Sequence, residues 1–221
     1  MDFRKYLGVP ITIDGRNKHA FDFILDKVRA RLSGWKAKSL SLASRMTLIA
    51  SVTSSVPIHL MQCNLLPSRI CTELDRLNRN FLWGDLSTKK KLHAINWDVV
   101  TKPEHLGGLG LKKSFPQNKS LLAKRAWAMH TNENTTWADT LRKKYLTSNT
   151  AKRKSTIWNN IQKSEPICKL GTRWLIRNDH SVKFWHDNWT RHGPLRILLR
   201  GPLHASDLHL KVKDTWDANG N

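Results

Sequence analysis

The 17 acidic residues of this 221-residue chain are scattered, which bears on whether it could hold catalytic metal ions. Metal-assisted polymerisation or hydrolysis of phosphodiesters needs carboxylates that hold two metal ions about 4 Å apart. The nearest acidic pairs are Glu73 with Asp75 and Asp214 with Asp217. Glu73 and Asp75 are two apart in a predicted helix and so face different directions, while the other pair lies in a tail of weak periodicity. We interpret both pairs as ordinary surface acids.

The histidines and cysteines are also dispersed along the chain. His180, His186 and His192 recur every six residues, a spacing that matches no helical face. The three cysteines form no C-x-x-C pair, and their odd number argues against a disulfide framework and a structural zinc site. Zinc at His186 and Asp187 is the weaker alternative. We therefore expect no metal, no cofactor and no catalytic residues, so that this chain alone is not an enzyme.

Charge is the strongest compositional signal. The chain has 38 Lys and Arg against 17 Asp and Glu, a formal net charge of +21 and a pI of about 10.4. Such a surplus attracts polyanions and is typical of nucleic-acid binders. The alternative is a chain that is basic only because it is a fragment or sits among other subunits. No apolar run has the length of a membrane span, and the first residues lack the apolar core of a signal peptide. We predict a nucleic-acid partner and no membrane.

The elements that would position these side chains are mostly helices. Ser41 is a suitable N-cap for one of them, Ser68 follows Pro67 at the start of another, and Gly84 ends that one. Apolar residues recur at helical spacing in six segments, by residue number 18–33, 42–55, 68–83, 118–130, 137–146 and 156–163. We expect the first two of these helices to pack together, with basic polar faces.

Two other segments favour turns and short strands. Residues 107–111, Gly-Gly-Leu-Gly-Leu, have the wrong spacing for a phosphate-binding loop. We interpret them as a turn in which glycine allows close backbone packing. Residues 173–177 and 182–185 flank Asn178 and Asp179, which predicts a β-hairpin near 172–186.

Several short motifs occur in an order that resembles a known family. They are YLGVPI at 6–11, LSGWKAK at 32–38, LSLASRMTLI at 40–49, VPIHLMQ at 56–62, FLWG at 81–84, residues 93–97, PEHLGGLGL at 103–111, LLAK at 121–124 with Trp127, STIW at 155–158 and residues 171–189. Together they resemble the region that follows the polymerase active site in plant non-LTR (LINE-type) retrotransposon reverse transcriptases. Ser44 stands where that family usually has glycine.

The resemblance implies a mainly α fold, a helical thumb-like bundle followed by an α+β region with short strands and a β-hairpin. It divides the chain into five parts, which are the end of the palm with a primer-grip strand (1–15), a helical thumb (16–84), a connection region (85–148), a small α+β segment preceding a zinc-binding-like domain (149–190) and a poorly ordered tail (191–221). The family's catalytic aspartates would precede Met1, so the resemblance implies a truncated fragment.

The implied function is that of a thumb and connection region, which binds an RNA–DNA or DNA duplex through its backbone without reading sequence. A non-functional relic of a retroelement and an active nucleic-acid enzyme with an unrecognised site are the alternatives. The sequence does not indicate an oligomeric state. The resemblance implies the nucleus as the compartment, with the mitochondrion as the alternative.

Candidate binding residues follow from the resemblance and from the positions of the charges. Three residues resemble the primer grip, namely Tyr6, Leu7 and Gly8. Tyr6 could equally be a buried residue of a small sheet. Five basic residues near the first helix pair are candidates for phosphate contacts, namely Arg29, Arg31, Lys36, Lys38 and Arg45. Four tryptophans adjoin apolar stripes or turn glycines and are expected to be core anchors rather than stacking platforms, namely Trp35, Trp83, Trp97 and Trp127.

Overall fold

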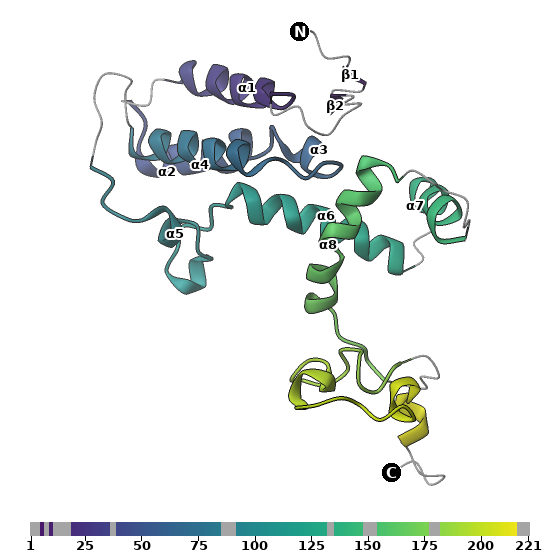
Figure 1. Cartoon of the computed structure of the whole chain (residues 1–221). Helices are drawn as coiled ribbons and strands as arrows, with labels where there is room; N and C mark the ends of the chain where they lie inside the picture. The colour runs from purple at the N-terminus through teal and green to yellow at the C-terminus, as the bar shows by residue number, and fades with distance from the viewer. Residues whose placement is uncertain are drawn as a thin grey trace. The chain divides into compact units, whose positions relative to one another are not determined.

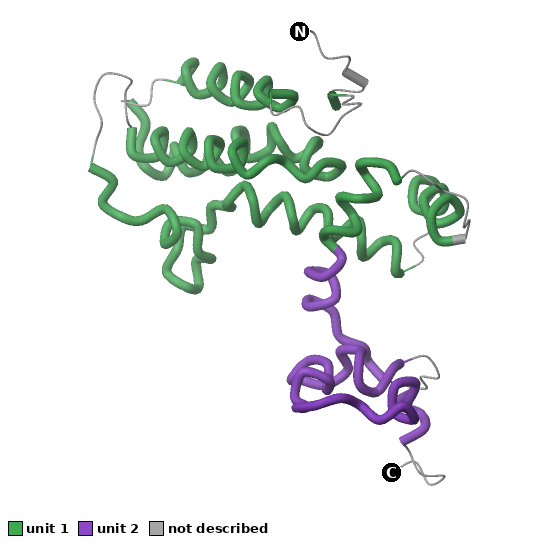
Figure 2. Tube along the Cα trace, in the orientation of Figure 1, with its two compact units in different colours: residues 1–164 green, residues 165–221 purple. Residues whose placement is uncertain are grey.

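The computed structural model describes residues 5–6, 9–10, 19–35, 39–84, 92–131, 135–147, 154–176 and 182–215. The chain divides into two compact units, residues 1–164 and residues 165–221 (Figure 2). The described residues are mainly helical, as the sequence predicted (Figure 1). Their only strands are β1 (Lys5–Tyr6) and β2 (Val9–Pro10), which pair antiparallel, Tyr6 opposite Val9. None of the described helices is long and apolar enough to cross a membrane.

The first half of unit 1 contains the helices that the apolar stripes predicted. They are α1 (Asp22–Ser33), α2 (Leu42–Leu48), the π-helical η2 (Ile49–Thr53), α3 (Ile58–Met61) and α4 (Ser68–Trp83). Ser41 is the predicted N-cap, because its hydroxyl accepts a hydrogen bond from the backbone N–H of Ser44 at 3.2 Å. Gly84 ends α4 in the left-handed conformation at φ 69°, as predicted.

Helix α4 lies between α1 and α6 (Figure 1), and it shares a core cluster with α1, α3 and the segment between α3 and α4. This cluster consists of Ile24, Leu25, Val28, Leu60, Met61, Leu66, Ile70, Cys71 and Leu74. The predicted packing of the first two helical segments is present as a contact between α1 and η2, and α1 packs more extensively on α4. A second cluster, around Phe81, Leu82 and Trp97, lies at the other end of α4.

The elements of the second half of unit 1 are α5 (Trp97–Val100), the 3₁₀ turn η3 (Glu104–Leu106), α6 (Ser114–His130), α7 (Thr136–Arg142), the π-helical η4 (Lys143–Thr147) and α8 (Thr156–Gly171), which ends in unit 2. This half contains a glycine turn between η3 and α6. A Cβ at Gly108 would lie 2.0 Å from the backbone oxygen of Lys102. This confirms the predicted close backbone approach.

Helix α6 begins four residues before the predicted start at Asn118. Pro116 falls in its first turn, where the backbone N–H groups have no partner within the helix, so a proline is tolerated there. The carboxylate of Asp75 on α4 accepts hydrogen bonds from the backbone N–H of Ser114 at 3.0 Å and from its hydroxyl at 2.7 Å. A side chain distant in sequence therefore caps α6, which a local pattern cannot reveal.

Asn118 is completely buried and joins α6 to the connection between α3 and α4. Its side-chain oxygen accepts a hydrogen bond from the backbone N–H of Leu66 at 2.7 Å. Its amide nitrogen donates to the backbone oxygens of Met61 and Asn64, both at 2.8 Å. One amide thus satisfies three buried backbone groups, and a buried backbone group left without a partner would be costly.

Unit 2 does not contain the predicted β-hairpin within its described residues. The backbone N–H of Trp174 donates to the backbone oxygen of Asn188 at 2.8 Å. The backbone N–H of Phe184 donates to the backbone oxygen of Leu210, and Val182 accepts from the backbone N–H of Val212. The two predicted strands therefore pair with other segments, and the predicted turn at Asn178 and Asp179 lies outside the described residues. The residue pattern of these two segments predicted extended backbone, but it could not predict which other segment each of them would pair with.

Residues 191–215, whose weak periodicity predicts poor order, form three short 3₁₀ turns. These are η5 (Leu195–Leu198), η6 (Asp207–His209) and η7 (Val212–Thr215). Val212 and Val182 are both buried, and the backbone N–H of Val212 donates to Val182 at 3.0 Å. Local periodicity misses such a core because its residues come from separate turns.

Replacing Asn118 should strongly destabilise unit 1. Asn118→Ala leaves three buried backbone groups without partners, and we expect the free energy of unfolding to fall by about 2–4 kcal/mol. Asn118→Asp keeps the acceptor but turns an oxygen toward two carbonyls, so it should be at least as harmful at neutral pH. Urea unfolding measures both, with Gln117→Ala on the same helix as the control. A loss below about 1 kcal/mol in Asn118→Ala would contradict the role of this amide.

Candidate nucleic-acid interface

Only one of the five basic residues proposed from the sequence is described as exposed with no acidic partner. Arg31 lies in the last turn of α1 and is exposed. Arg29 is also exposed, but its guanidinium donates to Asp26 at 3.2 Å and to Glu73 at 3.1 Å. Lys36 and Lys38 lie outside the described residues. The structure therefore brings no cluster of unpaired cations together from the described members of this set.

Arg45 has a structural position at the end of α4. Its Nη1 donates to the backbone oxygen of Leu82 at 3.0 Å, and a Cβ at Gly84 would lie 2.7 Å from the same nitrogen. The guanidinium satisfies one of the last carbonyls of the helix, and a cation is favourable at a helix C-terminus. Sequence reasoning missed this role because the two residues are 37 positions apart.

The residues proposed to resemble a primer grip are only partly described. The backbone of Tyr6 lies in β1, and Leu7 and Gly8 lie outside the described residues. Their proposed role stays a prediction.

The surface shared by α1 and α4 is a network of opposite charges. Asp22 pairs with Arg69 and with His19, the latter at 2.7 Å, and Glu73 pairs with Arg76 at 2.7 Å and with Arg29. Hydrogen bonds from Arg76 and Arg29 lower the pKa of Glu73 below its usual value. Burial raises the pKa of Asp22, but hydrogen bonds from His19 and Arg69 outweigh it and the pKa is lowered. Within this network the three arginines, Arg29, Arg69 and Arg76, are balanced by the three acids Asp22, Asp26 and Glu73.

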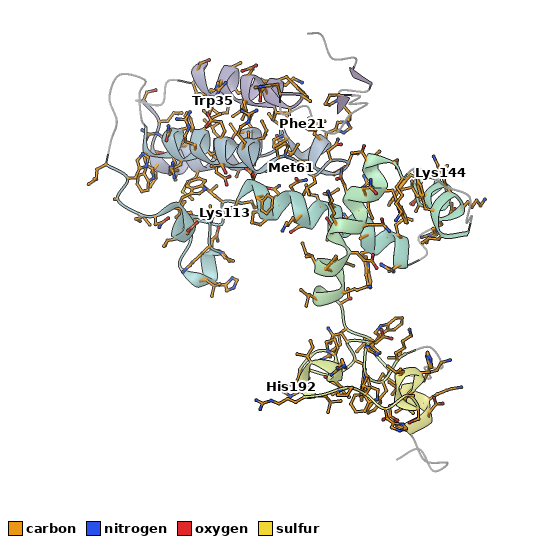
Figure 3. All side chains as sticks on the ribbon, viewed as in Figure 1. Phe21, Trp35, Met61, Lys113, Lys144 and His192 are labelled. Carbon is orange, nitrogen blue, oxygen red and sulfur yellow. The ribbon has the colours of Figure 1, made fainter. Side chains whose placement is uncertain are left out.

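Helix α6 has the opposite character, since none of its 17 residues is acidic. Helix α6 packs on α3 and α4, its last turns also contact α7, and one remaining side faces solvent. We call this solvent side the α6 outer face; its exposed or half-buried residues are Pro116, Lys119, Ser120, Ala123, Lys124 and Trp127. Lys112 is exposed just before the helix, and the neighbouring Lys113, labelled in Figure 3, pairs with Asp98. The α6 outer face is thus a basic surface within unit 1 that acidic side chains of its own helix do not neutralise.

Aromatic residues add to the α6 outer face. The ammonium of Lys119 lies 4.6 Å from the ring centroid of Phe115. Trp127 is 44% exposed, which corrects the expectation that it anchors the core. Of the other three tryptophans, Trp97 is buried, and Trp35 and Trp83 pack against the second core cluster, as expected.

The described residues form no metal site of the common kind. Among them, no group of three or more His, Cys, Asp or Glu side chains is placed to hold a metal ion. Cys71 is buried, and burial raises its pKa to about 12, so that this thiol stays protonated at neutral pH. Thiolates are the reactive form of cysteine, and Cys71 is therefore inert.

One curated protein is similar to this chain over most of its length. It is described as a “putative ribonuclease H protein” from the plant Arabidopsis thaliana and is 34% identical over 217 residues, which cover 94% of this chain. The chain spans about a third, 35%, of the length of that relative. No protein-family model matches the chain. No solved structure matches it either.

This comparison corrects the identification made from the sequence motifs. The relative is described as a ribonuclease H protein and not as a reverse transcriptase, and no family model supports the latter. The resemblance to a reverse transcriptase thumb and connection region, and the function it implied, are therefore wrong on these findings. Each of the motifs is short, and their order alone did not identify the family.

The two acids of α4 should affect stability in opposite directions as pH changes. Burial raises the pKa of Asp75 above its usual 3.8, although Ser114, Lys113 and Arg79 oppose this. A raised folded-state pKa means that the native state binds more protons, so this group lowers stability as pH rises from about 3.8 through the folded pKa. The pKa of Glu73 is lowered, so its stabilisation is present above about 4.5 and is lost as pH falls through the folded pKa.

We therefore expect Asp75→Asn to match or exceed the wild type in free energy of unfolding at neutral pH. The asparagine oxygen still accepts from Ser114, and no charge is buried. Glu73→Gln, its control on the same helix, should be less stable than the wild type at neutral pH. The Asp75→Asn difference should shrink toward zero below about pH 3.8, and the Glu73→Gln difference as pH falls from about 4.5 through the lowered pKa of folded Glu73. Urea unfolding of the three proteins across this range measures them, and differences of the same sign in the two variants would contradict these pKa shifts.

Proposed function

We propose that this chain binds nucleic acid through phosphate groups, and that the α6 outer face with Lys112 is the contact surface. The observation that carries the proposal is the distribution of charge in unit 1. Residues 1–164 contain 29 Lys and Arg against 11 Asp and Glu, a formal net charge of +18 out of +21. On α1 and α4 the acids Asp22, Asp26 and Glu73 pair with arginines, whereas α6 has no acids.

Three lysines supply the proposed contacts. Lys112 and Lys124 are exposed, and Lys119 is half-buried beside Phe115. A lysine ammonium is a flexible point charge that binds phosphate without demanding a fixed geometry. Phosphate contacts carry no sequence information directly, so we propose binding that is independent of sequence. The description of the relative as a ribonuclease H protein, a class that acts on nucleic acid, supports the same partner.

Removal of the three lysines should weaken binding and its salt dependence. We expect the variant Lys112→Gln, Lys119→Gln, Lys124→Gln to bind a fluorescent RNA or DNA oligonucleotide more weakly than the wild type. The slope of log affinity against log salt should fall by about 1 for each phosphate that the variant can no longer neutralise. Glutamine keeps the helix propensity of lysine, so the fold should be retained. Fluorescence anisotropy between about 50 and 200 mM salt measures both quantities.

The matched control removes the same charge from the paired surface. Arg29→Gln, Arg69→Gln, Arg76→Gln should leave affinity and slope nearly unchanged, because these arginines pair with Asp22 and Glu73. Equal losses in both variants would mean that total charge, and not the α6 outer face, governs binding. A larger loss in the control would favour the residues proposed on α1. No binding by the wild type at low salt would contradict the proposed function itself.

We further propose that the chain binds without cleaving. Metal-dependent hydrolysis of an RNA strand needs clustered carboxylates, and the described residues contain no group of three or more His, Cys, Asp or Glu side chains placed to hold a metal ion. We expect an RNA–DNA hybrid to remain intact after prolonged incubation with the purified chain and Mg²⁺ or Mn²⁺. Denaturing gel electrophoresis of the labelled RNA strand checks this. Metal-dependent cleavage that is lost with Asp75→Asn or Asp98→Asn would show a catalytic site.

A further inference from the structure

Trp127 is held with its indole toward solvent by the packing of the rest of α6. Leu122, Ala126 and Met129 fill the inner side of the helix, and the buried Asn118 fixes its rotation through three hydrogen bonds. Turning Trp127 inward would require the helix to rotate and to break these bonds. The exposure of this large side chain is therefore built into the fold, and large aromatic side chains are usually buried or in contact with a partner.

Cations flank Trp127 along the same face. Successive helical residues are about 100° apart, which places Lys124 about 60° to one side of Trp127 and one turn earlier. Lys119 lies about 80° to the other side and about 12 Å along the helix axis. Lys124 is exposed and Lys119 is half-buried, and α6 itself contains no acidic residue. A partner that fits must present a planar apolar surface next to negative charge.

We propose that Trp127 is a stacking platform for an unpaired nucleobase, with Lys124 on a neighbouring phosphate, so that the α6 outer face prefers single-stranded nucleic acid. This inference rests on the proposed function and names the form of nucleic acid that the site takes. Bases stack on aromatic side chains without regard to sequence because every base has a flat π-face. In a duplex those faces are covered by neighbouring base pairs, and a tryptophan on a convex helix cannot reach them.

The test compares two exposed tryptophans on three ligands. Trp127→Ala should bind a single-stranded oligonucleotide of about twelve nucleotides about 5- to 100-fold more weakly than the wild type. Trp127→Phe should keep most of the affinity. Trp174→Ala, which removes a tryptophan that is 50% exposed in unit 2, is the matched control and should bind like the wild type. For a blunt duplex and for an abasic strand of equal length, Trp127→Ala and wild type should bind equally.

Each outcome bears on one claim. If the wild type binds no ligand, the proposed function fails and the stacking role fails with it. If the wild type binds but Trp127→Ala binds the single strand equally well, the stacking role alone is overturned. An equal loss on normal and abasic strands, or in Trp174→Ala, also overturns it, because the effect would not depend on a base. Urea unfolding of each variant establishes that it is folded, and Trp127→Phe tests the same comparison if Trp127→Ala is not.

Discussion

The buried amide of Asn118 is the interaction on which the arrangement of unit 1 most depends. It joins α6 to the segment between α3 and α4 by satisfying Leu66 and two backbone oxygens at once. Apolar packing is tolerant of small rotations, whereas three buried hydrogen bonds made by one amide are not. The amide therefore determines which residues of α6 face the core and which face solvent. Together with the cap that Asp75 supplies at Ser114, it also fixes where α6 begins.

Given that orientation, the distribution of charge separates two surfaces of the same unit. A chain with a net charge of +21 repels itself when folded, and local pairing reduces that repulsion. On α1 and α4 the pairing is dense, and Glu73 alone serves Arg29 and Arg76. The ion pairs there are partly exposed and contribute little stability individually. Their larger effect is to leave the positive potential to other parts of the unit, which include the α6 outer face.

Local features of the fold could be predicted from the sequence, and features that depend on distant partners could not. The apolar stripe of α1, the N-cap Ser41 and the terminal Gly84 each follow from a few neighbouring residues. The role of Arg45 depends on a carbonyl 37 positions away, and the early start of α6 depends on Asp75. The α6 outer face could not be predicted for the same reason, because counting basic residues does not reveal which of them have acidic partners. From the sequence we expect Trp127 in the core because it adjoins an apolar stripe. The pattern does not show that Leu122, Ala126 and Met129 already fill the buried side of α6.

The approach of Gly108 to Lys102 has a consequence for how this gene changes over generations. A Cβ there would lie 2.0 Å from a backbone oxygen, so no choice of rotamer could relieve the clash. Any change at the first or second base of a glycine codon replaces the glycine, and every encoded replacement carries a Cβ. A copy of the gene free of selection would therefore lose this turn by a single common mutation. We therefore expect glycine at position 108 wherever a related gene still encodes this turn.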